Sequence, residues 1–558
     1  MPCRLPRQGI EGEGEGMADT FDLRARPWIP VALKGGSPTS VGLRELFHRA
    51  HEIEDLELPV PPAASGLLRI LAAMTSRIAA GREGARLDDE DLAEDTRGWL
   101  RLRNQVLERG RFDANAVDAY LDEEVPDGHL DLFHPTRPFL QDPRLRTECV
   151  DAKGQPNPSG VNKLVLGRPT GVNGAVLFGH FTDAQPVPVP AAAAAWHLIA
   201  QLYYGPSGQC TPRRITSVKP GNGDAGPLRK SVSYHPWADD LFTTLVLAVP
   251  QPGICGEPDA EDVCPWEAGA LPDPLGPTAS PSWPGRLLTG RARHAALLEP
   301  SADFTTVTDA YLTWSTHQPP AAARDPYVIL DMPKAGGGPP FARPADGNRA
   351  LWRDLDALLL KGGGQTQRPA AFESLPRTLR TGLRVRAYGF DQDGQQRDSS
   401  WFEATTPPVL DWQEDGPQPH MALRVGQCRE FAEQVGDKLQ YAARLAWKLA
   451  TDPGLDPTAK VKLDPKKPGP WAQAAQACYW PAAEREFWSL LAPEKTGDPL
   501  RPPFVEAALE ALDAAIGARS ADVRVARARV RARAVLRALL RPASAVPQPS
   551  GPSSGSDT

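Results

Sequence analysis

Histidine and cysteine are the residues of this chain best suited to metal or nucleophilic chemistry, and their spacing supports neither. His48 and His51 stand at positions i and i+3 of an expected helix, where two imidazoles could share a metal ion, but no third ligand is evident. A packed or solvated helix face is the simpler interpretation of this pair. The 7 cysteines include no C-x-x-C pair, which argues against a zinc ribbon and a thioredoxin-type site. We therefore expect no metal and no cofactor.

The sequence also lacks common enzyme motifs in the strand and helix contexts that they require. There is no G-x-x-x-x-G-K-[ST], no G-x-G-x-x-G after an expected strand, no H-E-x-x-H and no G-x-S-x-G elbow between a strand and a helix. The glycine runs at 336–338 and 362–364 could cradle a phosphate, but neither leads into a capped helix, so both are expected to be flexible loops. We expect a protein that is not an enzyme. An enzyme with an unrecognised site within 133–230 is an alternative.

Arginine is concentrated near the C-terminus in a way that suggests a ligand. Residues 519–541 have a net charge of +7, because they contain eight arginines and only one acidic residue, Asp522. Arginines at this density suit a polyanion, since each guanidinium can neutralise a phosphate and release a counterion. Arg524 and Arg527 are our candidate phosphate contacts. The alternative is the solvated outer face of a bundle helix, whose buried stripe would be Val525, Ala528, Ala532, Val535 and Leu539.

The whole chain is no small basic nucleic-acid module, because its 558 residues have a formal net charge of −7. Charge is nevertheless segregated along the sequence: residues 144–230 have a net charge of +6 and residues 231–285 one of −8. The hydrophobic content of 41% is enough for a large core, and the length suggests roughly two to four domain-sized units. The 49 glycines and 60 prolines predict long ordered loops.

The sequence carries no signal for a membrane. It has no run of about 18 uncharged apolar residues, and its beginning lacks the apolar segment of a secretory signal. We expect a cytoplasmic protein, and the odd number of cysteines fits a reducing compartment. Residues 1–16 are expected to form a disordered extension. Met17, which directly precedes the first patterned segment, is the expected start of translation.

The elements that would position these side chains begin with a strand around Trp28. Residues 21–36 alternate apolar and polar residues and break at a Gly-Gly pair, which predicts a hairpin strand. Residues 41–56 have apolar residues at helical spacing and predict a helix, as do residues 65–81. A further helix is predicted over 89–107, with an end at Gly110.

Loops dominate residues 133–230, where the main predicted helix is 191–205. From about residue 405 the pattern changes to four long amphipathic helices with connections broken by Pro and Gly, which is typical of a helical bundle. The predicted fold is therefore α+β. It comprises a large mixed α/β domain with long loops over 17–403, an all-α four-helix bundle over 404–541 and a disordered tail over 542–558.

Several segments, taken in chain order, point to one known family. They are FDLRARPWIPV and LRELFHRAHEIEDL near the N-terminus, LDLFHPTRPFLQ (130–141), VNKLVLGRPTGVNGAVLFGHFTD (161–183), WFEATTPPVL, and YWPAAEREFWSLL in the C-terminal part. Over roughly 17–541 the chain resembles CasA, the large subunit of the type I-E CRISPR surveillance complex Cascade. The shared order of the segments makes the resemblance specific.

The resemblance implies a non-catalytic protein with a mixed α/β N-terminal domain and a C-terminal four-helix bundle. Such a subunit lies beside the 5′ end of the guide CRISPR RNA, recognises the protospacer-adjacent motif (PAM) of invading double-stranded DNA, helps open the duplex and recruits a helicase-nuclease. The implied partners are the other Cascade subunits, the guide RNA, the target duplex and the helicase-nuclease, with no membrane. Guide pairing would supply most of the sequence specificity.

The resemblance also implies particular site residues. In the family a Gly-rich loop, a lysine finger and a glutamine wedge meet the PAM from the minor groove, where readout is degenerate. The segment that matches the wedge is AYGFDQDGQQRDSSWF, a hairpin-like turn. We place the wedge at Gln395, with Gln396 or Gln392 as alternatives. A polar hairpin turn without a wedge is the other interpretation.

The first recognition loop of the family corresponds to residues 161–183. Lys163 and Asn173 are its best polar candidates, Phe178 is its apolar anchor and His180 is the neighbour of that anchor. Ordinary burial in the core is the alternative for Phe178.

Three departures from the family pattern are visible. The Gly-rich loop should precede the helix at 191, but Pro190 and three alanines stand there; alanine still permits moderately close approach, so Ala191 stays a candidate contact. The lysine finger should lie near 271–276, yet the whole of 231–285 lacks Lys and Arg. Either Arg286 or Lys230 substitutes, or the protein has no finger. Some relatives hold zinc between two cysteine pairs, whereas Cys255 and Cys264 are spaced too widely for this.

A helical scaffold or adaptor without a nucleic-acid role is the runner-up function. In that interpretation the bundle binds another helix and the long loops have no ligand.

Overall fold

The structure is a computed structural model that describes residues 20–541 apart from short internal segments. Outside the described residues lie 1–19, 80, 82–85, 90, 93–94, 171–179, 256–261, 320–323, 334–337, 362–364, 393–397, 453, 456–460, 465–467, 496, 518–521 and 542–558. The extension predicted over 1–16, the start predicted at Met17 and the tail predicted over 542–558 all fall there. Within the described part, no helix combines the length and the apolar character needed to cross a membrane.

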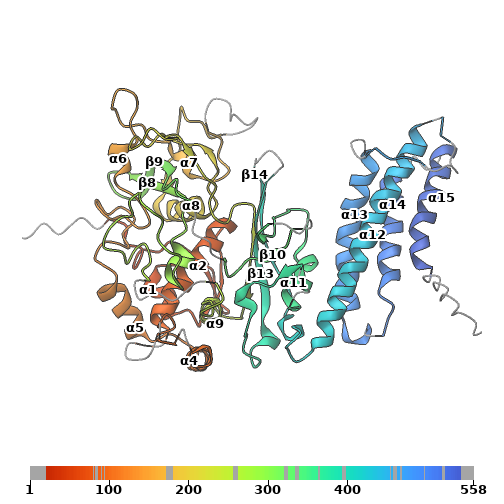
Figure 1. Ribbon diagram of the computed structural model, residues 1–558, viewed down its shortest axis with the longest axis horizontal. Helices are drawn as coiled ribbons and strands as arrows, with labels where there is room; N and C mark the ends of the chain where they lie inside the picture. Colours follow the sequence, from red (N-terminus) through yellow and green to blue (C-terminus); the bar gives the residue numbers. More distant parts are fainter. Residues whose placement is uncertain are drawn as a thin grey trace, which may run out of the picture. The chain divides into compact units, whose positions relative to one another are not determined.

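The chain divides into two compact units (Figure 1). The first consists of residues 1–350 and 362–411, and the second of residues 351–361 and 412–558. The first unit mixes strands and helices and the second is helical, so the predicted fold class is confirmed. The short segment 351–361 belongs to the helical unit although the first unit continues after it in sequence.

A small antiparallel sheet opens the first unit. Its order is β2 (Thr39–Val41), β1 (Ile29–Leu33), β3 (Ile53–Leu56). The strand predicted around Trp28 is thus confirmed, but the helix predicted over 41–56 is wrong in its second half, because α1 covers only Leu43–His48. Residues 53–56 form ladder pairs with β1 instead. Tertiary pairing with an available strand overrode the local helical spacing.

Helices that are buried on nearly all sides form the centre of the first unit. Helix α2 (Pro61–Ile78) is buried from its second residue to its last, and it packs on α8 (Ala191–Tyr204) and α9 (Leu241–Ala248). Gly66 of α2 permits the close approach to α8, because a Cβ there would collide with Ile199 and Tyr203. The predicted helix ending at Gly110 is α4 (Thr96–Arg109), which begins after the capping carboxylate of Asp95.

Two three-stranded antiparallel sheets complete the frame of this unit. One has the order β14 (Asp398–Thr405), β13 (Arg384–Gln392), β7 (Val232–Trp237), and the other the order β4 (Val189–Pro190), β9 (Thr306–Trp314), β8 (His294–Pro300). The remaining short elements are α5 (Ala114–Ala119), α6 (Leu145–Glu148), α7 (Val161–Leu164), α10 (Gly285–Thr289), β5 (Gly208–Gln209), β6 (Asn222–Gly223), β10 (Leu330–Asp331), β11 (Phe341–Ala342) and β12 (Thr366–Gln367).

Buried arginines hold the long loops of the first unit against its helices and sheets. Arg69 on α2 is 1% exposed and forms an ion pair of 2.9 Å with Asp325, a loop residue. Arg213 is equally buried and pairs with Asp142 and Glu148. The bidentate and charge-assisted geometry of such pairs fixes the direction of a loop more strictly than apolar packing does.

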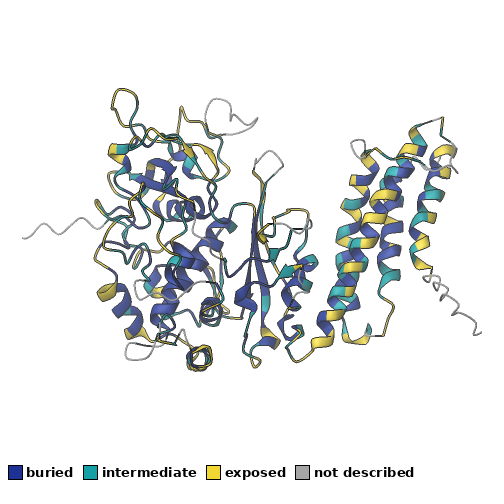
Figure 2. Ribbon diagram, in the orientation of Figure 1, coloured by how far each residue is buried: buried dark blue, intermediate teal, exposed yellow. Residues whose placement is uncertain are grey.

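The helical unit is built from four long helices, α12 (Pro419–Thr451), α13 (Pro470–Leu490), α14 (Arg501–Ile516) and α15 (Val523–Arg537). Their inward faces are buried and their outward faces exposed, as Figure 2 shows. On α15 the buried residues are Val525, Ala528, Ala532 and Leu536. The first three belong to the predicted stripe, whereas its other two members, Val535 and Leu539, are only half-buried. Helix α13 continues through Pro481.

The inserted segment 351–361, which contains α11 (Leu355–Leu359), packs on this bundle through a tryptophan and charged residues. The ring of Trp352 lies 4.6 Å from that of Phe487, and Arg353 lies over the ring of Trp480 while it pairs with Glu433.

Three buried histidines make the stability of the first unit depend on pH. Burial lowers the pKa of His197 and His294 to about 4 and that of His235 well below its usual value. Neither ring nitrogen of His235 has a hydrogen-bond partner among the described residues, and the centroid of its ring lies 4.4 Å from that of Tyr327, with the two planes tilted by 31°. All three are therefore neutral in the folded protein, whereas the unfolded chain takes up protons below about pH 6.5.

We predict that the free energy of unfolding falls as the pH is lowered from 7 to 5. A group with a depressed folded-state pKa stabilises the fold above its unfolded-state pKa, and this contribution is lost as the pH falls toward the folded value. Each buried histidine should account for about 2 kcal/mol over this range. In urea unfolding at pH 7 and pH 5, His235→Phe should reduce the pH-dependent loss of unfolding free energy by about the contribution of one histidine. His420→Phe, at an exposed position, should not reduce it. An unchanged pH dependence in His235→Phe would contradict the assignment.

Candidate nucleic-acid interface

The hairpin formed by β13 and β14 carries the segment that was predicted to contain the wedge. Its strands pair antiparallel from Arg386–Thr405 to Gln392–Asp398, with a bulge just before the last pair. Gly389 lies against the ring of Phe402, where any Cβ would overlap it. Five residues, 393–397, separate the strands. Gln395 and Gln396 therefore lie outside the described residues, and only the base of their hairpin is described.

Gln392 is the one wedge candidate that the structure places. It is the last residue of β13, and its Nε2 donates a hydrogen bond of 2.9 Å to Oδ1 of Asp398 across the hairpin. Its amide thus ties the two strands together where the ladder ends. This contact suits a residue that fixes the base of the hairpin.

Arg229 contacts the β13–β14 hairpin at Asp398 and Phe390. No sequence pattern indicates this contact. The side chain of Arg229 is 3% exposed, forms an ion pair with Asp398 and donates from Nη1 to the carbonyl oxygen of Tyr204. The guanidinium also lies over the ring of Phe390, 4.9 Å from its centroid. Burial lowers the pKa of Arg229, and the charge of Asp398 opposes this effect.

The segment 160–170 reaches the same hairpin from another side. Helix α7 ends near Lys163, a half-buried residue whose pKa is lowered by burial. Gln201 of α8 holds this end by donating from Nε2 to the carbonyl oxygens of residues 163 and 164, at 3.0 and 2.9 Å. Gly167, at a φ of 88°, then passes against Trp401 of β14, to which an added Cβ would come within 3.2 Å.

The rest of the predicted recognition loop is only partly described. Asn173 and Phe178 lie outside the described residues, and His180 is exposed just after the gap. Arg168 anchors the segment before the gap, because its Nη1 donates 2.9 Å to the carbonyl oxygen of Val187 and its guanidinium lies over the ring of Phe181. Sequence reasoning missed both Arg168 and Phe181.

The position of the missing Gly-rich loop is occupied by the start of α8. Ala191 is 1% exposed and its amide donates to the carbonyl oxygen of Thr305, at 2.9 Å. Its side chain therefore has no surface for a ligand in this conformation. Pro190, which is exposed, and the half-buried Ala192 and Ala193 form the surface of this turn.

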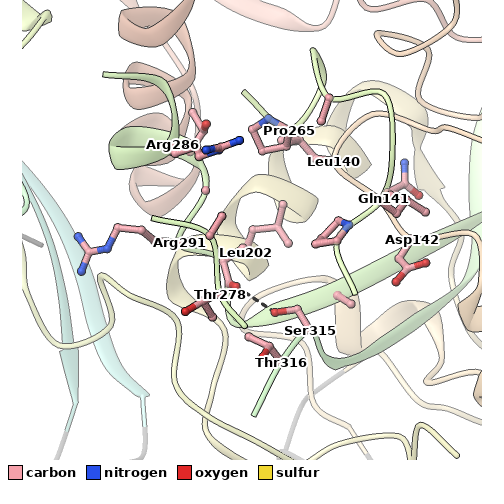
Figure 3. A pocket seen from close by; sticks show the side chains of 18 of the residues that line it. Leu140, Gln141, Asp142, Leu202, Pro265, Thr278, Arg286, Arg291, Ser315 and Thr316 are labelled. Atoms are coloured by element: carbon pink, nitrogen blue, oxygen red, sulfur yellow. Dashed lines mark hydrogen bonds between the residues drawn. The ribbon is translucent and has the colours of Figure 1, made fainter. Parts of the chain in front are cut away.

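The two candidate substitutes for the lysine finger occupy different settings. Lys230 is exposed and has a positive φ of 68°. It stands two residues before Val232, the pairing partner of Gly389, so it lies at the same end of the sheet as the hairpin tip. Arg286 is half-buried and lines a cavity of about 430 Å³ together with Leu140, Leu202 and Pro265 (Figure 3).

Four arginines of α15 fall into two groups within the helical unit. Arg529 and Arg533 pair with Asp513 of α14 and so contribute to the bundle. Arg524 and Arg527, the predicted phosphate contacts, are exposed. The prediction of a solvated outer face and the prediction of a polyanion site are both compatible with this placement.

The described part of the chain shows no cluster of side chains suited to a metal ion. No group of three or more His, Cys, Asp or Glu side chains there could hold a metal ion. Cys255 and Cys264 are both buried, and burial raises the pKa of both thiols.

Comparison with known proteins identifies the family. The model of the family described as CRISPR-associated protein Cse1 matches residues 22–520. Two solved chains titled as CRISPR RNA-guided surveillance complexes are 39% and 37% identical, with TM-scores of 0.78 and 0.71. They cover 93% and 94% of this chain and 99% and 100% of their own lengths. A Thermus thermophilus CasA (Cse1) structure is 22% identical, covers 94% of this chain and 99% of its own, and has a TM-score of 0.69, which shows the same fold.

A search of curated protein sequences gave no match. The family model nevertheless spans most of the chain, and the resemblance noted in the sequence is confirmed. On this evidence the chain belongs to the Cse1 family of CRISPR-associated proteins, also called CasA.

Proposed function

We propose that this chain is the large subunit of a type I-E Cascade complex, in which it recognises the PAM of double-stranded DNA and helps open the duplex for pairing with the guide CRISPR RNA. The observation that carries the proposal is the meeting of the β13–β14 hairpin, the 160–170 segment and Lys230 at one end of a sheet. A chain 39% identical over nearly its whole length comes from a CRISPR RNA-guided surveillance complex, which supports the assembly.

Duplex opening is assigned to the tip of the hairpin. A wedge must fill the space that a separating base pair leaves, and unstacking one step costs on the order of a few kcal/mol. The paired strands beneath the tip and the bond between Gln392 and Asp398 provide a stiff base for such an element. Gln395 is our wedge residue, with Gln396 as its alternative.

PAM contacts are assigned to residues around the hairpin. Lys163, Asn173, Phe178 and His180 belong to the recognition loop, and Pro190 with Ala192 and Ala193 takes the place of the Gly-rich loop. Of the two candidate fingers we choose Lys230, because this residue is exposed at the hairpin end of the sheet whereas Arg286 lines a cavity. Arg524 and Arg527 would contact phosphates without regard to sequence.

The remaining parts of the proposal follow from this role. The protein would act in the cytoplasm without catalysing a reaction, bound to the other Cascade subunits, and it would recruit a helicase-nuclease once the duplex is open. No feature of the described residues favours the adaptor alternative over the proposed function. R-loop formation by the assembled complex separates the two functions directly.

We predict that Gln395→Ala slows duplex opening about ten- to a hundredfold while initial docking changes little, because a wedge stabilises only the opened state. The measurement compares R-loop formation on an ordinary duplex and on one with mismatches already opened beside the PAM. The defect should disappear on the pre-opened duplex. If it persists there, and Gln392 and Gln396 variants behave alike, the hairpin tip is no wedge.

Lys230→Ala should reduce the preference for PAM-containing over PAM-lacking duplexes by about tenfold, because it removes a groove contact. Arg286→Ala should leave the preference unchanged. Competition binding with the assembled complex measures both variants. The reverse pattern would move the finger to Arg286.

Replacing both Arg524 and Arg527 by alanine should weaken binding to all duplexes alike. The slope of log affinity against log salt concentration should fall by about 0.9 for each phosphate that the variant no longer neutralises. Arg485→Ala, which removes an exposed charge from another helix of the bundle, is the matched control. An unchanged salt slope in the double variant would show that α15 binds no phosphate.

A further inference from the structure

Arg229 and an aromatic column join two elements that lie far apart in the sequence. The rings of Tyr204, Phe390 and Trp401 follow one another, with centroids 5.6 Å apart in the first pair and 6.4 Å in the second. They come from the last residue of α8, from β13 and from β14. Gly167 lies against the outer end of the column, at Trp401. The turn at residue 167 and the hairpin are thus in direct contact.

The contact between Gly167 and Trp401 requires glycine for two reasons. The φ of 88° lies in the left-handed region, which other residues rarely adopt. A Cβ at 3.2 Å from the Trp401 ring would also force one of the two elements to shift. The turn therefore contacts β14 at Trp401, three positions from the strand's first residue, Asp398.

Arg229 forms the second connection. Its guanidinium binds the carbonyl oxygen at the end of α8 and the carboxylate of Asp398, so it bridges a helix terminus, which favours positive charge, and the first residue of β14. At 3% exposure, loss of the ion pair would leave its charge poorly compensated. The side chain of Asp398 is 46% exposed, and Arg229 and Gln392 both contact its carboxylate.

The same end of α8 also holds the 160–170 segment. Gln201, one turn before Tyr204, donates to both carbonyl oxygens at the end of α7. Helix α8 therefore contacts α7 through Gln201 and the hairpin through Tyr204 and Arg229. Two separate contact paths, one through α8 and one through Gly167, lead from the segment to the hairpin.

We propose that the 160–170 segment and the β13–β14 hairpin respond as one unit, and that Arg229 and Trp401 are positioning residues which set the hairpin for opening when the segment is seated on assembly with the guide-RNA complex. This inference rests on the proposed function. It adds that the hairpin is not competent by itself. The basic character of the segment is compatible with an RNA partner, because Lys163 has no carboxylate within ion-pair distance among the described residues.

The test uses the complete Cascade complex reconstituted with variants of this subunit. In the wild type, hydrogen exchange of residues 384–392 and 398–405 should slow on assembly before any DNA is added, together with that of residues 161–170. In Arg229→Gln and Trp401→Leu the segment should still gain protection and the hairpin should not. Both variants should open a closed duplex about tenfold more slowly and a pre-opened duplex at the wild-type rate.

Control variants separate positioning from a general loss of structure. Trp401→Phe keeps an aromatic ring beside Phe390 but lacks the Cη2 and Cζ3 atoms that face Gly167, so it should slow the opening of a closed duplex while disturbing the packing of the hairpin less than Trp401→Leu does. Arg214→Gln removes a positive charge elsewhere in the basic residues 144–230 and should leave opening unchanged. The Nε of Arg214 donates a hydrogen bond to the carbonyl oxygen of Val150. A fall in the unfolding midpoint with equal slowing on both duplexes would show a merely structural role and overturn the proposal.

Two failures can be told apart. If the wild-type subunit assembles and opens DNA, but the hairpin is protected independently of the segment, only the coupling is wrong. If the wild-type subunit does not join the complex or support R-loop formation, the proposed function fails and the coupling fails with it.

Discussion

Compensation of buried arginine charge is the constraint on which the first unit depends. A chain with 49 glycines and 60 prolines leaves long stretches without helix or strand, and apolar packing alone does not fix the direction of such loops. Arg77 is buried beside Asp88, Asp262 and Glu267, and Arg386 bridges Asp55 and Glu403. Removal of one partner from such a buried pair costs roughly 3–5 kcal/mol, so each pair enforces one arrangement of the loops it joins.

This frame explains how a site can be assembled from loops. The 160–170 segment, residue 230 and the hairpin come from three separate parts of the sequence, and each is held by a neighbour with little freedom. The hairpin in turn is joined to β7 along its inner strand, and Arg386 of that strand pairs with Asp55 of the N-terminal sheet. The candidate interface is therefore continuous with the core through charged contacts as well as through strand pairing.

Sequence patterns predicted the parts of the molecule whose periodicity is local. The four long helices, α2, α8 and the strand at Trp28 were all visible as apolar spacing, because the burial of each requires one continuous face. Residues 53–56 show where this reasoning stops: their spacing continued a helix, but their partners in β1 lie twenty or more positions earlier in the sequence. Arg229 and Trp401 were missed for the same reason. The ion pair of Arg229 joins residues 169 positions apart, and no local pattern encodes such a pair.

The assignment of 351–361 to the helical unit has a consequence for the history of the chain. Trp352 and Arg353 pack on α13 and α12, although residues 362–411 of the other unit follow them before the bundle begins. The helical unit is therefore not encoded by one continuous stretch of sequence, although its four long helices are. Recombination at a single breakpoint near residue 412 would transfer the four helices and leave behind the tryptophan that covers them. Because the two units alternate along the sequence, inheritance of both together is favoured.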